Sequence, residues 1–476
     1  MASATSVLEQ ALGLLGVRRG EGRRTALLFA HLLLASAVFI LGRTVRDTLF
    51  LSRYSLKALP WMFVLYGLAS AITAVVYARF ADKIPRHVAI LASVAIGIVT
   101  YLGVWVAVRA GATFIYPVFY VWSEVVANLF IVQFWTLAND LHDPRSAKRL
   151  FGTIGAARIL GVVLVGTTAG IIVRAIGTAQ LLFVLMAMMI AIAFIALALS
   201  REPRPEVEVR GTTTKREHAV VSDPYVQALA VFLLFAFTAL TVGDYQFKAI
   251  ARATYREDAL AQFFALFYAA TGIVSFLFQL FVTPRLLRRL GVGWGMSVMP
   301  GVFGGASALL PFVPSLGLAS AMKFADNGFQ YTIHETTLQA LYVPFPAAVK
   351  ARTRAILDAV VKPCAYGAGG VLLLLLAERL SVANLSYVTS AVVVVWLSSV
   401  PLVRRRYLSS LESTLSVRGT LALDADFVLD AGSRRALLSV LERGNPRHVL
   451  AALEQLGSDA TPELRQHIER LSASDD

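Results

Sequence analysis

The chain has 476 residues, of which 57% are hydrophobic and only 16% are charged. A soluble domain carries about a quarter charged residues, so this composition excludes an ordinary soluble globular protein. The net charge of +14 could indicate nucleic-acid binding. Most of the basic residues lie in short loops, however, and no zinc pattern or other nucleic-acid motif accompanies them, so we expect no nucleic-acid partner.

Residues 1–24 are polar and rich in arginine, and they lack the apolar run and cleavage site of a signal peptide. We expect them to form a cytoplasmic N-terminal segment. After them, apolar runs of roughly 20 residues alternate with short connectors, and a run of that length crosses a bilayer as an α-helix. No alternating pattern indicates a barrel, so helices must satisfy the backbone in the lipid bilayer.

The apolar runs predict an all-α membrane protein with twelve spans. The predicted spans are 25–47, 58–80, 87–108, 113–139, 150–173, 178–199, 225–249, 260–282, 291–312, 316–342, 355–377 and 383–403. The cytoplasmic linker 201–224 combines prolines, three consecutive threonines and mixed charge, which is typical of a solvated connector. It divides the membrane region into two six-helix halves, 25–200 and 225–403.

Lysine and arginine residues outside the spans gather on one side of the membrane, about 24 against about 7 on the other. Because cytoplasmic loops carry this excess, we predict that both termini are cytoplasmic and that the chain lies in the cytoplasmic (inner) cell membrane. Two termini on one side require an even number of spans, which agrees with twelve.

An internal repeat relates the two halves, because adding 202 to many positions in the first half gives a similar residue in the second. The matched pairs are Arg46 and Lys248, Tyr66 and Tyr268, Lys83 and Arg285, Arg86 and Arg288, Glu124 and Asp326, Asn128 and Gln330, and Lys148 and Lys350. A direct six-plus-six repeat is the major facilitator arrangement, with a substrate site near the midplane between the halves. The loop 78–87 also resembles the facilitator signature G-x-x-x-D-[RK]-x-G-[RK], with both glycines replaced; an ordinary basic loop is the alternative.

Ionisable side chains within spans are costly and usually face a cavity. Here they are Arg43, Arg46, Asp47, Glu124, Arg158, Asp244, Lys248, Lys323, Asp326, His334, Glu335, Asp358 and Lys362. The repeat places Arg46 and Lys248 at equivalent points of the first and seventh spans, which line the pathway in this fold. Two cations facing a central pathway favour an anionic substrate such as a phosphate or a carboxylate.

These charges supply the candidate site. Substrate contact is expected from Arg46, Lys248, Arg43, Lys323, Arg158 and Lys362. Gating or coupling roles are expected for Asp47, Glu124, Asp326, Glu335, Asp82, Lys83, Arg86, Lys148, Arg149, Arg352, Arg354 and Asp358. Structural alternatives stay open: Arg43 and Asp47 could pair or snorkel near a helix end, Glu124 and Asp326 could hold helices together, and His334 could be structural rather than a proton relay.

Aromatic residues gather on the fourth and tenth spans, and they could stack a purine or simply face lipid. They are Tyr116, Tyr120, Trp122, Phe134, Trp135, Phe324, Phe329, Tyr331 and Tyr342. No nucleophile–base set appears, so we expect no catalytic residues and no enzyme activity. No His/Cys cluster has metal-ligand spacing, so neither a metal site nor a cofactor is expected.

Five sequence blocks resemble the ATP/ADP translocases of plastids and intracellular bacteria. Residues 43–49 are similar to that family's R-D-T-K-D-x-L, 134–140 to its F-W-G-F-A-N, 147–151 to its E-A-K-R-F-Y, 341–344 to its A-Y-I-P, and 350–358 to its K-x-K-G-K-A-x-x-D. The resemblance covers most of residues 25–403. It implies a nucleotide transporter that exchanges ATP for ADP by alternating access, with basic residues on the phosphates.

The resemblance carries over to some charged positions and fails at others. It carries over to Arg46, where the family has lysine, and to Lys148, Arg149, Arg352, Arg354 and Asp358. It departs at Leu338 and Gln339, which replace a Lys-Glu pair, at Ser123, where the family's acidic residue falls one step before Glu124, and at 365–369, where a lysine is lost. A related nucleotide, another organic anion or a changed coupling mode therefore remain alternatives.

Residues 404–476 change to the pattern of soluble helices, near 433–443, 446–457 and 461–471, and resemble HEAT-type repeats. Such repeats need about three units for a stable core, so we expect this cytoplasmic tail to dock on the transporter or on a protein partner, or to be a solvated extension. The sequence thus predicts a secondary transporter of a nucleotide or other phosphorylated anion. A transport-incompetent membrane scaffold with a partner-binding tail is the alternative.

Overall fold

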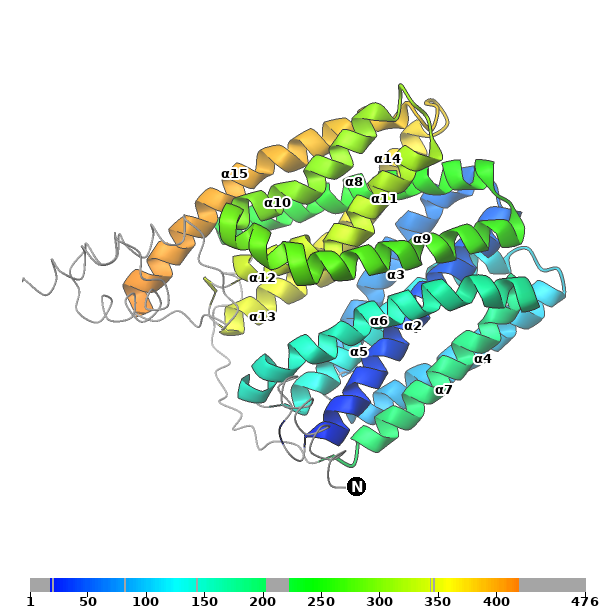
Figure 1. The fold of residues 1–476 in the computed structure, drawn as a ribbon, viewed down its shortest axis with the longest axis horizontal. Helices are drawn as coiled ribbons and strands as arrows, with labels where there is room; N and C mark the ends of the chain where they lie inside the picture. The colour runs from blue at the N-terminus through cyan, green and yellow to red at the C-terminus, as the bar shows by residue number, and fades with distance from the viewer. Residues whose placement is uncertain are drawn as a thin grey trace, which may run out of the picture.

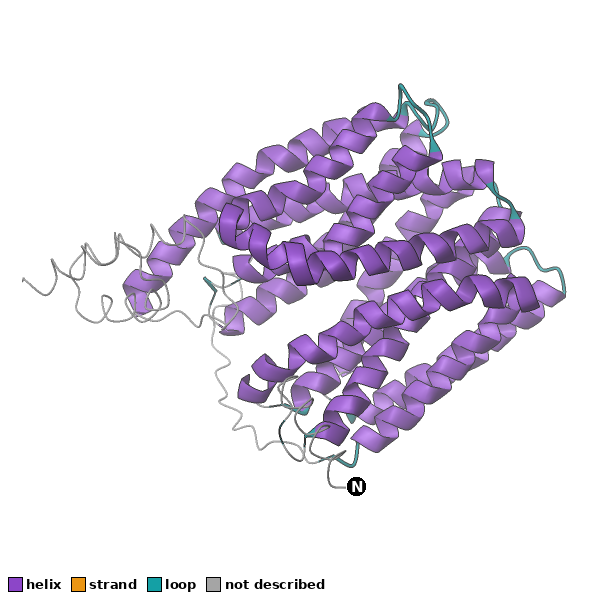
Figure 2. Cartoon of the chain, in the orientation of Figure 1, coloured by secondary structure: helices purple, strands orange, loops and turns teal. Residues whose placement is uncertain are grey.

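The computed structural model describes residues 18, 21–80, 83–142, 144–202, 222–342, 344–345 and 347–418. Every regular element in these ranges is a helix (Figure 2), which confirms the predicted all-α class. The three helices predicted for the tail lie outside the described residues, as do most of the N-terminal segment and of the linker.

The first half contains six long helices. They are α2 (Gly22–Arg53), α3 (Leu59–Phe80), α4 (Arg86–Arg109), α5 (Ile115–Asp140), α6 (Pro144–Ile176) and α7 (Leu181–Leu199), with short 3-10 turns η1 (Leu56–Ala58) and η2 (Thr178–Gln180). Each long helix corresponds to one predicted span. Several extend beyond the predicted bounds, because polar residues outside the hydrocarbon core continue the helix.

The second half is less regular. It contains α8 (Pro224–Thr254), α9 (Glu257–Leu277), η3 (Phe278–Val282), α10 (Thr283–Leu309), α11 (Leu316–Phe329), η4 (Gln330–His334), α12 (Glu335–Leu341), α13 (Ala347–Ile356), η5 (Leu357–Val361), α14 (Lys362–Leu376) and α15 (Leu385–Arg418). The elements η3, η4 and η5 are π-helical turns inside three of the predicted spans. Such turns are rare in proteins overall, and many of them occur at functional sites. The hydropathy of the sequence gives no sign of them. The last helix, α15, continues past residue 403, where the sequence predicted the start of the tail.

All twelve predicted spans are helical, and ten helices in the described ranges are long and apolar enough to cross a membrane. The other two predicted spans are 291–312 and 316–342. The first is rich in glycine, and the second is interrupted by η4 and carries four ionisable side chains. Both nevertheless pack inside the second half, where α10 contacts α11 and α15.

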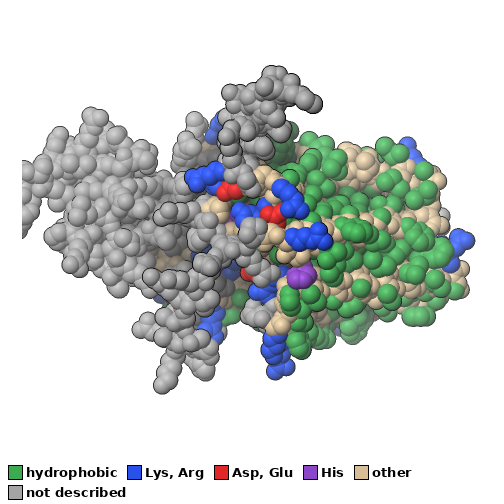
Figure 3. Space-filling view, turned by 90° about the horizontal axis from the view of Figure 1, so that it is seen from below, with side chains coloured by type: hydrophobic (Ala, Val, Ile, Leu, Met, Phe, Trp, Pro, Cys, Tyr) green, Lys and Arg blue, Asp and Glu red, His purple; other side chains and the backbone are tan. Residues whose placement is uncertain are grey.

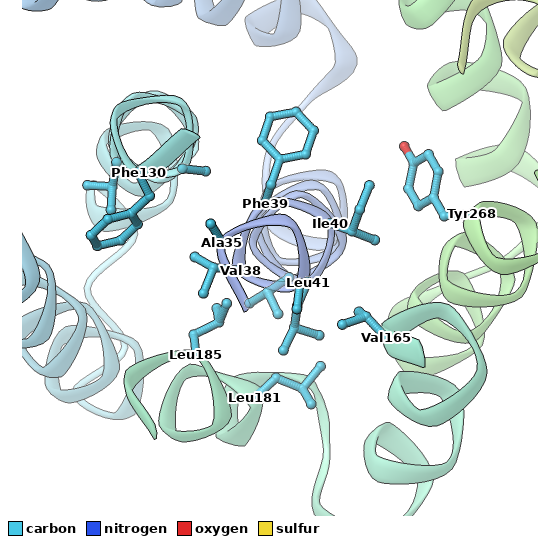
Figure 4. Close-up of a cluster of buried hydrophobic side chains, with 14 of the residues drawn as sticks. Ala35, Val38, Phe39, Ile40, Leu41, Phe130, Val165, Leu181, Leu185 and Tyr268 are labelled. Atoms are coloured by element: carbon cyan, nitrogen blue, oxygen red, sulfur yellow. The ribbon is translucent and has the colours of Figure 1, made fainter. Parts of the chain in front are cut away.

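The helices form two bundles, α2–α7 and α8–α15, which lie side by side (Figure 1). Across their boundary α6 packs against α9, and α3 against α14. Inside the first bundle α2 is central, and Figure 4 shows Val38 and Leu41 of α2 directed toward Leu185, Leu181 and Val165 of α7 and α6. All five side chains are at most 4% exposed, so burial of this apolar cluster holds the bundle together.

The outer surface of the bundles is strongly apolar. Large hydrophobic side chains such as Val99, Ile171 and Phe194 are about 70% exposed. Figure 3 shows a broad hydrophobic surface beside a zone in which lysine, arginine and acidic side chains gather. A soluble monomer rarely exposes so large an apolar area, so this surface fits contact with lipid.

The two ends of the molecule differ. We call the end where α2, α4, α6 and α8 begin the basic end, and the opposite end, where α3, α5 and α9 begin, the distal end (Figure 1). The described helix ends that border the predicted cytoplasmic loops lie at the basic end. Its cytoplasmic location stays a prediction.

Small residues let the two bundles approach closely in the distal part of the structure. Gly166 of α6 lies against Ala269 of α9, with no room for a side chain on the glycine. A Cβ atom on Gly67 of α3 would come within 2.6 Å of the Pro363 carbonyl oxygen on α14. These helix pairs therefore meet backbone to backbone, as small residues allow in membrane proteins.

We predict that Gly166→Val destabilises the protein, because the added side chain must displace α9. Overpacking of this kind costs about 1–3 kcal/mol. Gly170→Val is the matched control, since Gly170 lies one turn further along α6 and has no atom within 4 Å of its Cβ position. The measurement is the thermal unfolding midpoint of the purified variants; equal midpoints for both would contradict the close contact.

Candidate functional site

A cavity of about 1480 Å³ lies between the two bundles. Its walls come from α2, α3, α5 and α6 on one side and from α8 and α11–α14 on the other. It reaches Asn139, close to the end of α5, and Lys350, in α13, so it extends to the basic end. Its inner part ends at Arg46 and Lys323. A cavity with charged groups in its lining, between the two halves, is where a substrate is expected in this arrangement.

Eight charged side chains, none more than 15% exposed, lie at the inner part of the cavity or directly behind its wall. This apex network consists of Arg43, Arg46 and Asp47 on α2, Glu124 on α5, Asp244 and Lys248 on α8, and Lys323 and Asp326 on α11. It holds four cations and four carboxylates and is therefore electrically neutral. Burying an isolated charge costs several kcal/mol, and the pairing within this network avoids that cost.

In the first half, Glu124 forms ion pairs with two arginines. Arg46 Nη1 is 2.5 Å from Glu124 Oε2, and Arg43 Nη2 is 3.2 Å from Glu124 Oε1. Arg46 Nε also lies 3.3 Å from Asp47 Oδ1. The Arg46 guanidinium sits 4.5 Å from the centre of the Tyr120 ring, a cation–π arrangement that further fixes it.

In the second half, Asp244 forms ion pairs with two lysines. Its oxygens lie 2.6 Å from Lys323 Nζ and 2.7 Å from Lys248 Nζ. Lys323 Nζ is also 2.6 Å from Asp326 Oδ2. Each half thus contains a carboxylate held between two cations. Glu124 and Asp244 are not related by the 202-residue offset, so this likeness does not follow from the repeat.

Lys248 joins the two halves. Its Nζ atom is 3.1 Å from Asp47 Oδ1 on α2 and donates a hydrogen bond of 2.8 Å to the Tyr120 hydroxyl on α5. Lys248 and Asp47 are both fully buried and lie behind the cavity wall. Arg43 Nη1 makes a second, weaker crossing at 3.5 Å to Asn327 Oδ1. The Lys248 contacts thus join the halves behind the cavity wall, and the Arg43–Asn327 contact joins them within the lining itself.

A second set of charged residues lines the cavity nearer the basic end. This outer group consists of Arg158, Glu335, Lys350, Arg354, Asp358 and Lys362. Lys362 Nζ is 2.6 Å from Asp358 Oδ1, and Arg354 lies 3.6 Å from both Glu335 and Asp358. These pairs are more exposed than the apex network, so they are weaker and easier to exchange for another anion.

The cavity lining carries more positive than negative charge. It contains seven lysines and arginines and five acidic residues. Three of these cations and three of the acids belong to the neutral apex network. The outer group holds the other four cations and only two acids, so the whole excess lies there. An anion that enters from the basic end therefore meets the cationic part first.

Several predicted gating residues lie away from the cavity and join helices of the first half. Arg86 Nε is 2.8 Å from Asp140 Oδ2, which links α4 to α5. Arg149 Nη2 is 2.7 Å from Glu21 Oε1, which links α6 to the start of α2. The hydrogen bond from Arg149 lowers the pKa of Glu21, so this link persists at neutral pH and weakens as the pH falls through that lowered value.

Of the remaining predicted positions, those that the structure describes do not line the cavity. Lys83 is exposed beside the Phe80 ring, and Arg352 is exposed on α13. Asp82 and the Lys148 side chain lie outside the described residues. His334 is buried, with its ring stacked on Phe232. In the part of the chain that the structure describes, no group of three or more His, Cys, Asp or Glu side chains is placed to hold a metal ion.

The sequence did not single out three partners in the apex network as site residues. Asp244 stands four residues before Lys248, a spacing that brings helical side chains together, so its pairing was detectable. Tyr120 appeared only as one of several aromatic residues, and Asn327 not at all. Their contacts join α5 to α8 and α11 to α2, and nothing in the local pattern indicates such pairs.

We predict that Lys248→Met and Asp47→Asn are each strongly destabilising, because each removes one charge from a buried neutral network and leaves that network with an uncompensated charge. Breaking a buried pair costs about 3–5 kcal/mol. The double variant should be more stable than the sum of the two single losses implies. Thermal unfolding of the four proteins measures this coupling. The exposed pair Lys57–Glu378 is the control, and additive losses at Asp47 and Lys248 would contradict a direct interaction.

Comparison with known proteins adds a family and a relative. A profile of the Major Facilitator Superfamily matches residues 27–343. The chain is 21% identical over 383 residues to the ADP,ATP carrier protein 1 of Chlamydia muridarum (strain MoPn / Nigg), a match that covers 70% of each protein. The resemblance to nucleotide translocases that the sequence blocks predict is confirmed by this match.

Solved transporter structures share the fold. A crystal structure of a mutant nucleoside transporter, NupG, superposes with a TM-score of 0.59 at 11% identity and covers 81% of this chain and 99% of that chain. The inward open xylose transporter XylE from E. coli gives a TM-score of 0.55 at 13% identity, covering 80% and 95%. At such low identities the likeness shows the fold alone.

Proposed function

Because the chain belongs to the Major Facilitator Superfamily and is a multi-pass membrane transporter of that type, we propose that it carries nucleotides across the cytoplasmic membrane by alternating access, in an ATP/ADP-type exchange. The observation that carries the proposal is the excess of cations in the outer group of the cavity. Similarity to the ADP,ATP carrier of Chlamydia muridarum supports the substrate class. The basic end would face the cytoplasm.

The size of the cavity suits a large substrate. Ligand pockets for drug-sized molecules measure about 300–1,000 Å³, and this cavity, at about 1480 Å³, is larger. A nucleotide with its phosphates and bound water fits such a space. Tyr66, Phe237 and Tyr366 line the same cavity and form edge-to-face contacts, so an aromatic surface is available to the base.

The charges of the cavity suggest how a nucleotide drives the conformational change. Phosphates attracted to the outer group can move inward and compete with Glu124 and Asp244 for their arginines and lysines. Loss of these carboxylate contacts weakens the network that includes the Asp47–Lys248 bridge between the halves. A ligand shifts a conformational equilibrium only through different affinity for the two states, and competition for the apex cations supplies that difference.

The direct test is counterflow in proteoliposomes loaded with unlabelled ATP. We expect labelled ADP and ATP to accumulate transiently, and unlabelled nucleotides to compete more strongly than nucleosides, which lack phosphate. Uptake of a different organic anion with no competition from nucleotides would replace the nucleotide proposal and leave the transporter fold intact. If none of the tested nucleotides, nucleosides and organic anions is transported under any gradient, the result would favour the scaffold alternative.

We predict that Lys350→Gln raises the KM for nucleotide roughly ten- to hundredfold with a smaller effect on kcat, because a charge-assisted contact to phosphate is worth about 1.5–3 kcal/mol. Lys350 lines the cavity and is half-buried. Lys57→Gln removes the same charge from an exposed position outside the cavity and is the matched control. Initial uptake rates over a range of nucleotide concentrations measure both constants. Equal effects of the two variants would point to a general loss of surface charge.

A further inference from the structure

A second cavity, of about 700 Å³, lies on the outer surface at the basic end, in a groove between α10 and α15. Its lining residues are Gly293, Trp294, Ser297, Val400, Pro401, Arg404, Arg405 and Leu408. None of them lines the cavity between the bundles. The transport proposal therefore assigns no role to this groove. A function of the groove can be tested independently of the transported substrate.

Two arginines lie at one end of the groove. Arg404 and Arg405 are exposed, and among the described residues no ion pair joins either guanidinium to a carboxylate. The Arg404 side chain lies across Gly293, so close that a methyl group on Gly293 would come within 3.1 Å of Arg404 Cδ. Because Gly293 has no side chain, the Arg404 side chain can pack against α10 within the groove. Its positive charge there favours binding of an anion.

The rest of the groove is apolar and faces outward. Trp294 is 60% exposed, and Val400, Pro401 and Leu408 complete the wall. Further along the same two helices, toward the distal end, Val302, Val394 and Val395 are exposed as part of the apolar surface. The groove therefore lies where the apolar surface meets the charged zone. Tryptophan and arginine are typical of this depth, at the level of the lipid headgroups.

We propose that this groove binds an anionic phospholipid, with the phosphate on Arg404 and Arg405 and an acyl chain along Trp294 and Leu408. Basic pockets between membrane helices on the cytoplasmic side bind anionic headgroups in this way. A free phosphate ion could bind the two arginines, but it would leave the apolar wall of the groove exposed. A lipid satisfies both parts of the groove, and the surrounding bilayer supplies it at high local concentration.

The test is quenching of Trp294 fluorescence by lipids brominated in the acyl chain. The full-length protein is reconstituted in phosphatidylcholine vesicles that contain a minority of brominated phosphatidylglycerol or of brominated phosphatidylcholine. We expect stronger quenching by the phosphatidylglycerol, and we expect this difference to disappear in Trp294→Phe, which identifies the tryptophan that reports it. Equal quenching by the two lipids overturns the proposal.

Matched variants separate a specific site from general surface charge. Arg404→Gln combined with Arg405→Gln should weaken the preference for phosphatidylglycerol roughly thirtyfold, given about 1 kcal/mol for each basic residue at the membrane surface. Arg406→Gln alters an exposed neighbour on α15 that does not line the groove and should retain the preference. An equal loss in Arg406→Gln, or full competition by inorganic phosphate, overturns the lipid assignment. All three arginines are exposed, so the variants should fold.

Discussion

The neutrality of the apex network is the constraint on which the rest of the structure depends. Eight charges cannot be buried within a membrane protein unless each has a partner of opposite sign. Four helices from both halves must therefore arrive at one point with their side chains in register. The close packing of α6 on α9 and of α3 on α14 makes this approach possible, because glycines remove the side chains that would hold the bundles apart.

A neutral apex also explains why the cationic excess lies elsewhere. If Arg46 and Lys323 were unpaired, they would bind an anion tightly and hold it. Because Glu124, Asp244 and Asp326 already occupy these cations, an incoming anion must exchange one ionic partner for another. Exchange between similar partners is nearly balanced in energy, which suits a transporter that must release its substrate as well as bind it. The outer group attracts the anion, and the apex network exchanges its carboxylate contacts for contacts with the anion.

The sequence predicted the general arrangement well. Helical crossing follows from the length of the apolar runs, and the constant offset identified Arg46 and Lys248, which the structure brings within reach of the same carboxylate, Asp47. The pairing itself was not predictable, because Lys248 contacts α2 and α5, far away in the chain. The π turns η3–η5 were also missed, since they depend on packing. The continuation of α15 past residue 403 was hidden because charged residues continue a helix as readily as apolar ones.

The departures from the translocase blocks become intelligible in the structure. Gln339 stands where the family has glutamate, and its Nε2 atom donates a 2.7 Å hydrogen bond to Glu335, one turn earlier. Both side chains line the cavity, so a carboxylate is present on the same helical face, displaced along α12. On α5, Ser123 is buried against Gly42 of α2, whereas Glu124 faces the cavity and holds both arginines. A carboxylate at position 123 would point into that packed contact. In this chain the acidic side chain therefore stands on the face of α5 that meets the cavity, where both arginines contact it.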